Sequence, residues 1–294
     1  MDRINAHTQL LTLMAYPIRH SRSPAMHNEA FRYLGLDYAY LCFDVDQDNL
    51  KGAIDAMRAL NVRGGNVSMP NKIEVMKYLD VISPDSQLFG AVNTIVNDDG
   101  VLTGYTTDGT GYTMALEDRG IDLAGKKLTV CGAGGIGKVI HMKSAMAGAA
   151  ELSVFCARDK YWERAAQSVR QVNELTDCRA ELFDLADLSE LKRQIHDSYL
   201  LVNATSVGMH PLEGQTYIPD PSYFREGMYV MDVVYEPSRT KFLELAAQAG
   251  CVTINGLSLM LFQGAASFKL WTGAEMPIDH MKEFLGIDSA GKTK

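Results

Sequence analysis

The 294-residue sequence lacks the features that mark several specialised classes of protein. Its five cysteines are scattered and no two stand at C-x-x-C spacing, which argues against a disulfide framework and against a zinc site. Positive charge is in the minority, with 28 Lys and Arg against 36 Asp and Glu, and no basic run is present. We therefore expect reduced thiols, no metal and no nucleic-acid partner.

The sequence also has no long hydrophobic run. The apolar stretch near the start, Leu10–Ile18, is shorter than the roughly 20 residues that a transmembrane helix needs. It has neither the basic leader nor the small-residue cleavage site of a signal peptide. These absences predict no membrane partner and a cytoplasmic location.

What is present is a regular alternation of short apolar runs and amphipathic stretches. The length and the apolar share of 47% favour an ordinary globular chain of two domains. In the first part we expect strands at Leu10–Tyr16, Tyr38–Val45, Gly65–Ser68 and Ala91–Asn97, and helices at Ala25–Leu34, Leu50–Leu60 and Lys72–Leu79. The turn signal Asn97–Gly100 predicts a hairpin into the run Val101–Tyr105.

The alternation becomes cleaner after the polar loop Gly120–Lys127. Strands are expected at Leu128–Cys131, Leu152–Cys156, Arg179–Phe183, Tyr199–Asn203, Tyr229–Val234 and Cys251–Ile254, with helices such as Tyr161–Leu175 and Thr240–Ala249 between them. Strands and helices in strict alternation predict a parallel sheet covered on both faces. The last helical run, Leu257–Leu270, follows the final strand and is expected to return to the first domain.

The strongest local signal is a glycine-rich loop, Gly132-Ala133-Gly134-Gly135-Ile136-Gly137, between a predicted strand and a predicted helix. In this context the glycines allow a tight turn, close approach of a pyrophosphate, and packing of helix on strand. The helix N-terminus then offers free N–H groups to the anion. A P-loop would need Ser or Thr where Val139 stands, so a dinucleotide site is favoured, while a purely structural turn stays open.

An acidic residue stands where a dinucleotide fold places one for the ribose. Asp159 follows Gly137 by 22 positions, just past the second strand of the predicted Rossmann unit. A carboxylate there favours NAD by accepting from the ribose 2′-hydroxyl. The neighbouring Arg158 keeps NADP open, because a guanidinium suits a 2′-phosphate, and a solvated ion pair is the alternative for both residues.

Two common dehydrogenase chemistries find no support. No cluster of Cys and His suggests a catalytic zinc ion, and none of the 13 tyrosines is followed by Lys four residues later. The proton that accompanies hydride transfer must therefore be handled by other groups, which we expect in the first domain.

Several motifs together resemble one family, the shikimate dehydrogenases, in order and spacing. They are Ser21-Arg22-Ser23-Pro24, Asn66–Lys72, Ala91–Thr94, Gly104–Gly109, Asn203–Met209, Asp232–Tyr235 and Gln263–Ala265. The resemblance covers nearly the whole chain. Within the family, Val67–Lys72 and the pair Arg158-Asp159 look most like the quinate/shikimate dehydrogenase branch.

The resemblance implies an α/β fold of two domains. Residues 1–110, with helices 257–286 returning to them, would form a mixed α/β substrate-binding catalytic domain, and 111–256 a Rossmann dinucleotide-binding domain. It further implies an NAD-dependent oxidoreductase, with NADP as an alternative, acting on the ring alcohol of shikimate, quinate or both. An aminoshikimate-type enzyme and a non-catalytic dinucleotide sensor are the alternatives. We expect a small carboxylated ring substrate as the partner and a monomer or homodimer.

The family also implies roles for single residues. Lys72 and Asp108 would be the catalytic pair, and Ser21 and Ser23 would bind the substrate carboxylate. The ring hydroxyls would be bound by Asn66, Asn93, Thr107 and Gln263, with Tyr40 and Tyr235 as further contacts. The dinucleotide would contact the glycine loop together with Arg158, Asp159, Asn203, Thr205, Val207, Met209, Val234 and Gly256.

Each of these residues also has a structural interpretation. Taken alone, Lys72 is a solvated residue at a helix start, Asp108 a helix cap, and Gln263 a surface residue. The sequence departs from the family at Thr106, where Asn is usual, and in the glycine loop, which usually continues with small residues and here continues with Ile136, Gly137 and Lys138. The joint match therefore carries the assignment more than any single position does.

Overall fold

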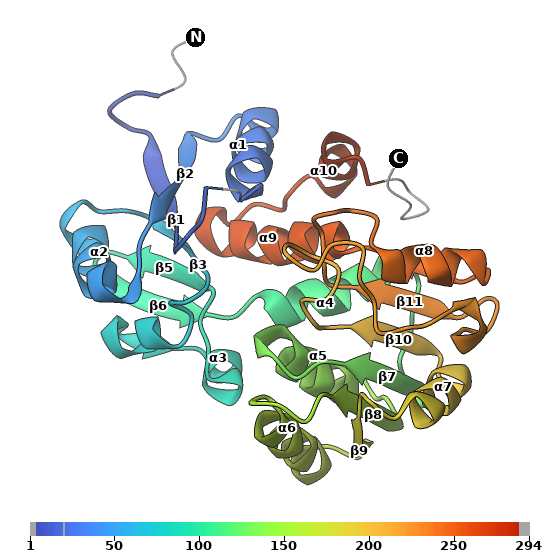
Figure 1. Cartoon of the computed structure of the whole chain (residues 1–294). Coiled ribbons are helices and arrows are strands. Elements are labelled where there is room, and N and C mark those ends of the chain that lie inside the picture. The colour runs from blue at the N-terminus through green and yellow to red at the C-terminus, as the bar shows by residue number, and fades with distance from the viewer. Residues whose placement is uncertain (1–3, 20, 288–294) are drawn as a thin grey trace. The chain divides into compact units, whose positions relative to one another are not determined.

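The computed structural model describes residues 4–19 and 21–287, and these fall into two compact units (Figure 1). Unit 1 comprises the described residues up to Gly111 together with Gln263–Leu285, and unit 2 comprises Tyr112–Phe262 with the last two described residues. Two helices belong partly to each unit: α4 (Asp108–Glu117) and α9 (Gly256–Thr272).

Unit 1 is built on a mixed six-stranded sheet in the order β2-β1-β3-β5-β6-β4. Strand β1, second in this order, runs parallel to β2 and β3, whereas β5 runs antiparallel to β3 and β6. The hairpin predicted at Asn97–Gly100 is confirmed, with positive φ at Asp99 and Gly100 in its turn. The strands are β1 (Gln9–Ala15), β2 (Tyr38–Asp44), β3 (Gly64–Val67), β4 (Val81–Ile82), β5 (Thr94–Asp98) and β6 (Val101–Tyr105).

The helices of unit 1 supply two different cores. An aliphatic cluster that includes Leu50, Ile54 and Ile95 joins α2 to the sheet, and an aromatic cluster that includes Phe31 and Trp271 joins α1 and α9 to it. The α10 helix lies beside α1 (Figure 1). The helices are α1 (Ser23–Leu34), α2 (Gln47–Ala59), the 3₁₀ turn η1 (Glu74–Tyr78), α3 (Pro84–Phe89) and α10 (Ile278–Leu285).

One helix predicted in unit 1 is wrong. Residues 72–79 were expected to form a helix, but Lys72 lies in a turn and only Glu74–Tyr78 adopt a short 3₁₀ helix. This segment leaves β3 and must turn at once to bring Val75 into the core, so a tight 3₁₀ turn replaces a regular α-helix.

Unit 2 has a fully parallel six-stranded sheet in the order β12-β11-β10-β7-β8-β9. This is the doubly wound order, in which the strand succession reverses between β7 and β10 and ligands bind outside the carboxyl ends of the strands. The predicted parallel sheet is confirmed. The strands are β7 (Lys127–Cys131), β8 (Glu151–Cys156), β9 (Arg179–Asp184), β10 (Leu200–Asn203), β11 (Tyr229–Asp232) and β12 (Val252–Ile254).

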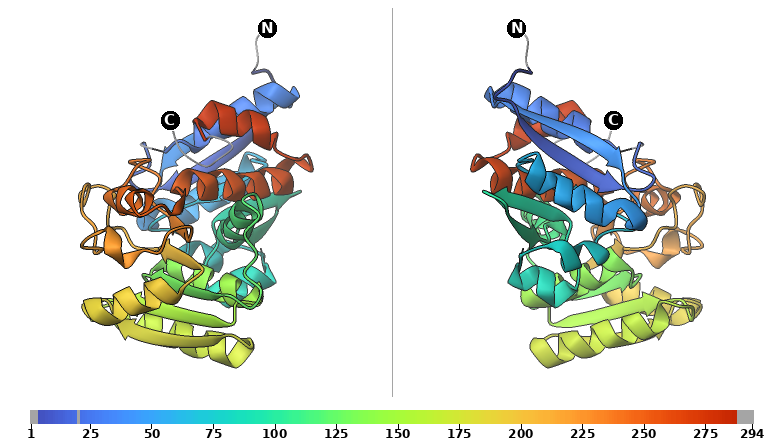
Figure 2. Two further views of the ribbon diagram at one scale, coloured as in Figure 1. Left: turned by 90° about the vertical axis from the view of Figure 1, so that its right-hand side faces the viewer. Right: turned by 90° about the vertical axis from the view of Figure 1, so that its left-hand side faces the viewer.

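Helices cover both faces of this sheet. Leu191 of α7 and Phe242 of α8 pack into one core cluster with Phe155 and Val230 of the strands. The α5 and α6 helices pack against each other over the β7–β9 half (Figures 1 and 2). The helices are α5 (Gly135–Met146), α6 (Trp162–Leu175), α7 (Leu188–Asp197), the 3₁₀ turn η2 (Pro221–Tyr223) and α8 (Lys241–Gln248).

Within residues 4–19 and 21–287, no helix combines the length and the apolar character that a membrane crossing needs.

Candidate functional site

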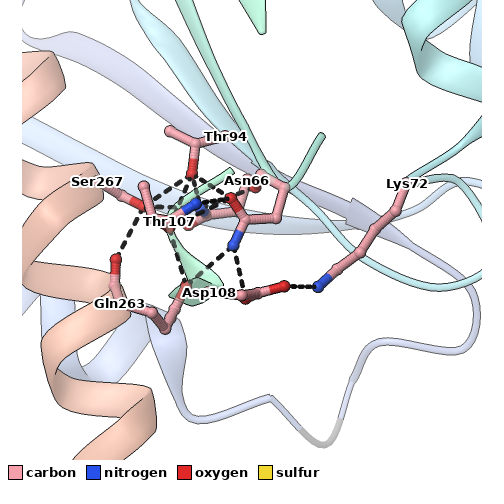
Figure 3. A network of polar contacts seen from close by, with 8 residues as sticks. Asn66, Lys72, Thr94, Thr107, Asp108, Gln263 and Ser267 are labelled. Carbon is pink, nitrogen blue, oxygen red and sulfur yellow. Dashed lines mark hydrogen bonds and ion pairs between the residues drawn. The ribbon is translucent and has the colours of Figure 1, made fainter. Parts of the chain in front are cut away.

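Lys72 and Asp108 form an ion pair at one edge of the polar network in unit 1 (Figure 3). The Lys72 Nζ atom lies 2.6 Å from Oδ2 of Asp108. Lys72 sits in the turn after β3, and Asp108 is the first residue of α4, separated from β6 by two residues. The side chains of Lys72 and Asp108 are 25% and 19% exposed. The pair is therefore held in place and is still accessible to a small molecule.

Asn93 fixes the other oxygen of Asp108. Its Nδ2 donates to Oδ1 of Asp108 over 2.7 Å, while its own Oδ1 accepts from the backbone N–H of Thr107 over 2.8 Å. Because a backbone N–H can only donate, this bond determines which way the Asn93 amide faces. The carboxylate of Asp108 is therefore oriented on both sides, by an amide and by an ammonium group.

A second buried amide, Asn66, belongs to the same network. Its Nδ2 donates to the backbone oxygen of Asn93 (3.0 Å) and to the hydroxyls of Thr94 (3.1 Å) and Ser267 (3.2 Å). Its Oδ1 accepts from the Tyr40 hydroxyl over 2.7 Å. Tyr40 has no exposed surface, so in this structure its hydroxyl is used to orient Asn66.

Gln263 joins the network from α9. Its Oε1 lies 3.5 Å both from Nδ2 of Asn93 and from Oγ1 of Thr107. These distances are at the long limit for a hydrogen bond. Ser267 stands one turn further along α9 and bonds the Thr107 hydroxyl at 3.0 Å (Figure 3).

The two serines expected to bind a carboxylate lie together at the start of α1. Ser23 is the first residue of that helix, and its backbone N–H donates to Oγ of Ser21 over 3.2 Å. Both residues are half-buried. Tyr235, the other expected substrate contact, is half-buried and belongs to unit 2.

The glycine loop of unit 2 has the backbone that the sequence predicts. Gly132 has φ +109°, and a Cβ there would stand 2.6 Å from the backbone oxygen of Ala204. A Cβ on Gly137 would stand 2.4 Å from the backbone oxygen of Gly132, so only glycine lets α5 begin this close to β7. Gly134 and Gly135 face open space. Their N–H groups at the helix start suit a pyrophosphate.

The other residues expected around a dinucleotide gather at the carboxyl ends of β10 and β11. Thr205 and Val207 bond to the Asn203 side chain, Met209 is exposed, and Val234 is buried. A Cβ on Gly256 would stand 2.3 Å from the backbone oxygen of Val233, so the start of α9 is pressed against the segment after β11.

Arg158 and Asp159 do not pair with each other. The Arg158 guanidinium lies 4.2 Å over the Trp162 ring, and its Nε donates to Oδ2 of Asp184 over 2.8 Å. Asp159 is exposed and accepts from the backbone N–H of Tyr161 at 2.8 Å. The interpretation of the two as an ion pair with each other is therefore wrong.

Some residues of these networks escaped the sequence analysis. Ser267 carries a signal in hindsight, because it stands four positions after Gln263 and shares its face of the helix. Thr94 directly follows Asn93 in a quoted motif. Asp184 and Trp162, which hold Arg158, carry no signal of their own, because only the fold brings them together.

A doubly wound sheet with this glycine loop, combined with a second α/β unit that carries a lysine–carboxylate pair, defines a dinucleotide-dependent oxidoreductase. Residues 13–95 match the shikimate dehydrogenase substrate binding domain, and residues 256–283 match the shikimate 5'-dehydrogenase C-terminal domain. The chain belongs to the shikimate dehydrogenase family.

Individual relatives extend this likeness over the whole chain. Shikimate dehydrogenase (NADP(+)) of Listeria monocytogenes is 52% identical, over 97% of this chain and 98% of the relative. Quinate/shikimate dehydrogenase of Escherichia coli is 44% identical, over 97% and 99%. The solved structure of shikimate 5-dehydrogenase from Listeria monocytogenes, in complex with shikimate and NAD, is 52% identical and superposes with a TM-score of 0.92, over 97% of this chain and 99% of that one.

Proposed function

We propose that this chain transfers a hydride between NAD(P) and the ring alcohol of shikimate, quinate or both. The observation that carries the proposal is the Lys72–Asp108 pair, which is partly exposed and enclosed by amide and hydroxyl side chains. A small ring with several hydroxyls needs such a set of directed polar partners. The relatives named for shikimate and for quinate support the same substrate class.

In this proposal Lys72 handles the proton. During reduction of the ketone, its ammonium group donates a proton to the oxygen that becomes the alcohol and stabilises the charge that develops there. During oxidation, the proton of the alcohol leaves to the Lys72/Asp108 pair. Asp108 and Asn93 keep the lysine in position between turnovers. When bound, the nicotinamide ring supplies or takes up the hydride.

The remaining polar residues of unit 1 would bind and orient the ring. Ser21 and Ser23 present two hydroxyls at the start of α1, where the helix dipole favours the substrate carboxylate. Asn66, Asn93, Thr107 and Gln263 offer donors and acceptors to the ring hydroxyls.

The residues of unit 2 fit a dinucleotide, because the loop at Gly134 and Gly135 faces open space and the turn at Gly132 accepts no side chain. We propose that NAD is preferred and NADP is also accepted. Asp159 is exposed beyond β8, where a carboxylate accepts from a ribose 2′-hydroxyl. Arg158 is held nearby and moderates the repulsion of a 2′-phosphate. The relatives named for NADP(+) and the one crystallised with NAD support use of both.

A steady-state panel tests the proposal directly. Shikimate and quinate are each assayed against NAD and NADP, with reduction of the dinucleotide followed by absorbance. We expect activity with at least one of the two alcohols and with both dinucleotides. No activity in any of the four combinations would contradict the proposal.

The division of labour between the units, with substrate bound by residues 1–110 and dinucleotide by 111–256, is part of this proposal. A monomer or homodimer and a cytoplasmic location stay predictions.

A further inference from the structure

Asp232, the last residue of β11, carries a carboxylate that is fully buried in unit 2. Nδ2 of Asn203 (2.9 Å) and the backbone N–H of Val234 (3.0 Å) donate to its Oδ1, and the Thr240 hydroxyl donates to its Oδ2 over 2.6 Å. Burial raises the pKa of Asp232 to about 6, so it is ionised at neutral pH at a cost in stability. An uncharged side chain can usually occupy a buried position at a smaller cost in stability. We therefore ask which neighbouring group the Asp232 carboxylate orients.

The group held by Asp232 is the amide of Asn203, at the end of the neighbouring strand β10. A carboxylate only accepts hydrogen bonds, so it turns Nδ2 of Asn203 toward itself and leaves Oδ1 for the loop that follows. That Oδ1 accepts from the backbone N–H (3.1 Å) and the hydroxyl (2.7 Å) of Thr205. Nδ2 also donates to the backbone oxygen of Val207 over 3.2 Å. A flipped amide would lose all these bonds.

The loop that Asn203 organises lies directly against the glycine loop. A Cβ on Gly132 would stand 2.6 Å from the backbone oxygen of Ala204 and 3.0 Å from Cγ2 of Thr205. Residues 204–205 therefore form one wall of the turn after β7. Both segments lie at the carboxyl ends of parallel strands, where doubly wound folds bind dinucleotides.

We propose that Asp232 is a positioning residue for the dinucleotide site: through the Asn203 amide, its carboxylate sets the conformation of residues 204–207 against the glycine loop. The step from loop conformation to dinucleotide affinity rests on the proposed function. The step from Asp232 to the loop rests on the hydrogen bonds alone.

Asp232 is also the group of this cluster that titrates near neutral pH. The Tyr217 hydroxyl lies 3.3 Å from Oδ1 of Asn203, and burial raises its pKa well above 10. Burial likewise raises the pKa of the neighbouring Cys131 thiol to about 12. The strands β10 and β12 carry no titratable side chains. In the first turn of α8, Glu244 lies within 4 Å of both Arg239 and Lys241.

Two variants separate positioning from general stability. Asp232→Asn keeps the shape and an acceptor but removes the charge. Thr240→Val removes the hydrogen bond to the other oxygen of the same carboxylate, and with it the N-cap of α8, but has no bond to the loop. The measurements are hydrogen exchange of residues 204–209 without dinucleotide, dissociation constants for NADP⁺ and NAD⁺ by calorimetry, and Tm.

For Asp232→Asn at pH 8 we expect faster exchange in the loop and both dissociation constants raised roughly 3- to 10-fold, since charge-assisted hydrogen bonds are about twice as strong as neutral ones. Its Tm is expected to be no lower than that of the wild type. Thr240→Val should lower Tm and leave exchange and both constants within about twofold. Wild-type affinity should weaken from pH 8 to pH 5, and that of Asp232→Asn should stay level.

The inference is overturned if Asp232→Asn leaves loop exchange and affinity unchanged, or if Thr240→Val shifts both as strongly. A wild-type protein that binds neither dinucleotide would contradict the proposed function instead. The exchange comparison would then still decide whether Asp232 holds the loop.

Discussion

At the scale of single residues, the role of Lys72 depends on its ability to release a proton. Lys72→Ala should lower kcat by roughly 10²- to 10⁴-fold, the range for loss of a general acid or base, with a smaller change in KM. Lys72→Arg is the matched control, because it keeps a positive charge beside Asp108 but cannot give up its proton. Both variants should be slow in steady-state assays. Near-normal kcat in Lys72→Ala would show that the proton is handled elsewhere.

The hydroxyls of Ser21 and Ser23 test how the substrate is held. Replacing both by Ala removes hydrogen bonds to a carboxylate, each worth about 1–3 kcal/mol. We expect KM for shikimate or quinate to rise by roughly 10-fold or more, with kcat and Tm near the wild-type values. An unchanged KM in the double variant would mean that the carboxylate binds at another place.

Asp159 tests the choice of dinucleotide. Asp159→Ser removes the acceptor for a ribose hydroxyl and the negative charge that repels a 2′-phosphate. The ratio of kcat/KM for NAD to that for NADP should fall, while the same change at Asp177, an exposed acid after α6, should leave it unchanged. If the ratio is unchanged in Asp159→Ser, or if the wild type favours NADP, then Arg158 determines the dinucleotide preference instead.

At the scale of elements, the junction of β7 and α5 depends on the absence of one side chain. In Gly137→Ala the new Cβ meets the backbone oxygen of Gly132, which cannot move aside as a flexible side chain would. We expect a loss of about 1–3 kcal/mol in the free energy of unfolding. Gly135→Ala, whose Cβ meets nothing within 4 Å, should change it by less than about 0.5 kcal/mol. Denaturant unfolding without dinucleotide measures both, and equal losses would contradict the packing argument.

The sequence predicts elements well where a pattern is long and local. The strand Arg179–Asp184 and the helix Trp162–Leu175 were expected within a residue of their bounds, because the spacing of apolar residues carries the signal. The strand Val81–Ile82 has two residues, too few for any period to show.

The candidate site divides in the same way. The glycine loop is contiguous and was found from its own residues, whereas Lys72 and Asp108 gained weight only from the family resemblance. Contacts between distant segments could not be predicted from local sequence. Asn66 and Ser267, for example, form a hydrogen bond although 201 positions separate them in the sequence. The same holds for Asp232, whose bond to Asn203 spans 29 positions.

At the scale of the whole molecule, two buried histidines contribute to how stability depends on pH. Burial lowers the pKa of His27 to about 3 and that of His141 to about 4. Below about pH 6.5 these imidazoles are protonated in the unfolded chain but stay neutral in the folded chain. The stability of the folded state therefore falls as pH falls. Asp232 acts in the opposite sense, because its raised pKa favours the folded state as pH falls from about 6 to about 4. Hydrogen bonds from Arg32 and Arg193 lower the pKa values of Glu29 and Glu190 to about 2, so these carboxyls also lose stability as pH falls below about 4.5. Together with the two imidazoles they outweigh Asp232, and we expect a net loss of stability in acid.

His27 provides the sharper test of this balance. Neither ring nitrogen has a hydrogen-bond partner, and the ring stacks on Tyr40 at 4.6 Å and meets Trp271 edge-on at 5.2 Å. An apolar ring suits that place, so His27→Phe should be within about 1 kcal/mol of the wild type at pH 7. At pH 4–5 the variant should be the more stable of the two, because phenylalanine does not titrate and protonation of the unfolded chain at this position no longer favours unfolding.

In the matched variant His141→Phe, the bonds to Ser168 and to the backbone oxygen of Gly132 are lost, which should cost about 1–3 kcal/mol already at pH 7. Unfolding curves between pH 4 and pH 8 measure the stability of both variants. If His27→Phe loses as much stability in acid as the wild type does, groups other than His27 cause that loss.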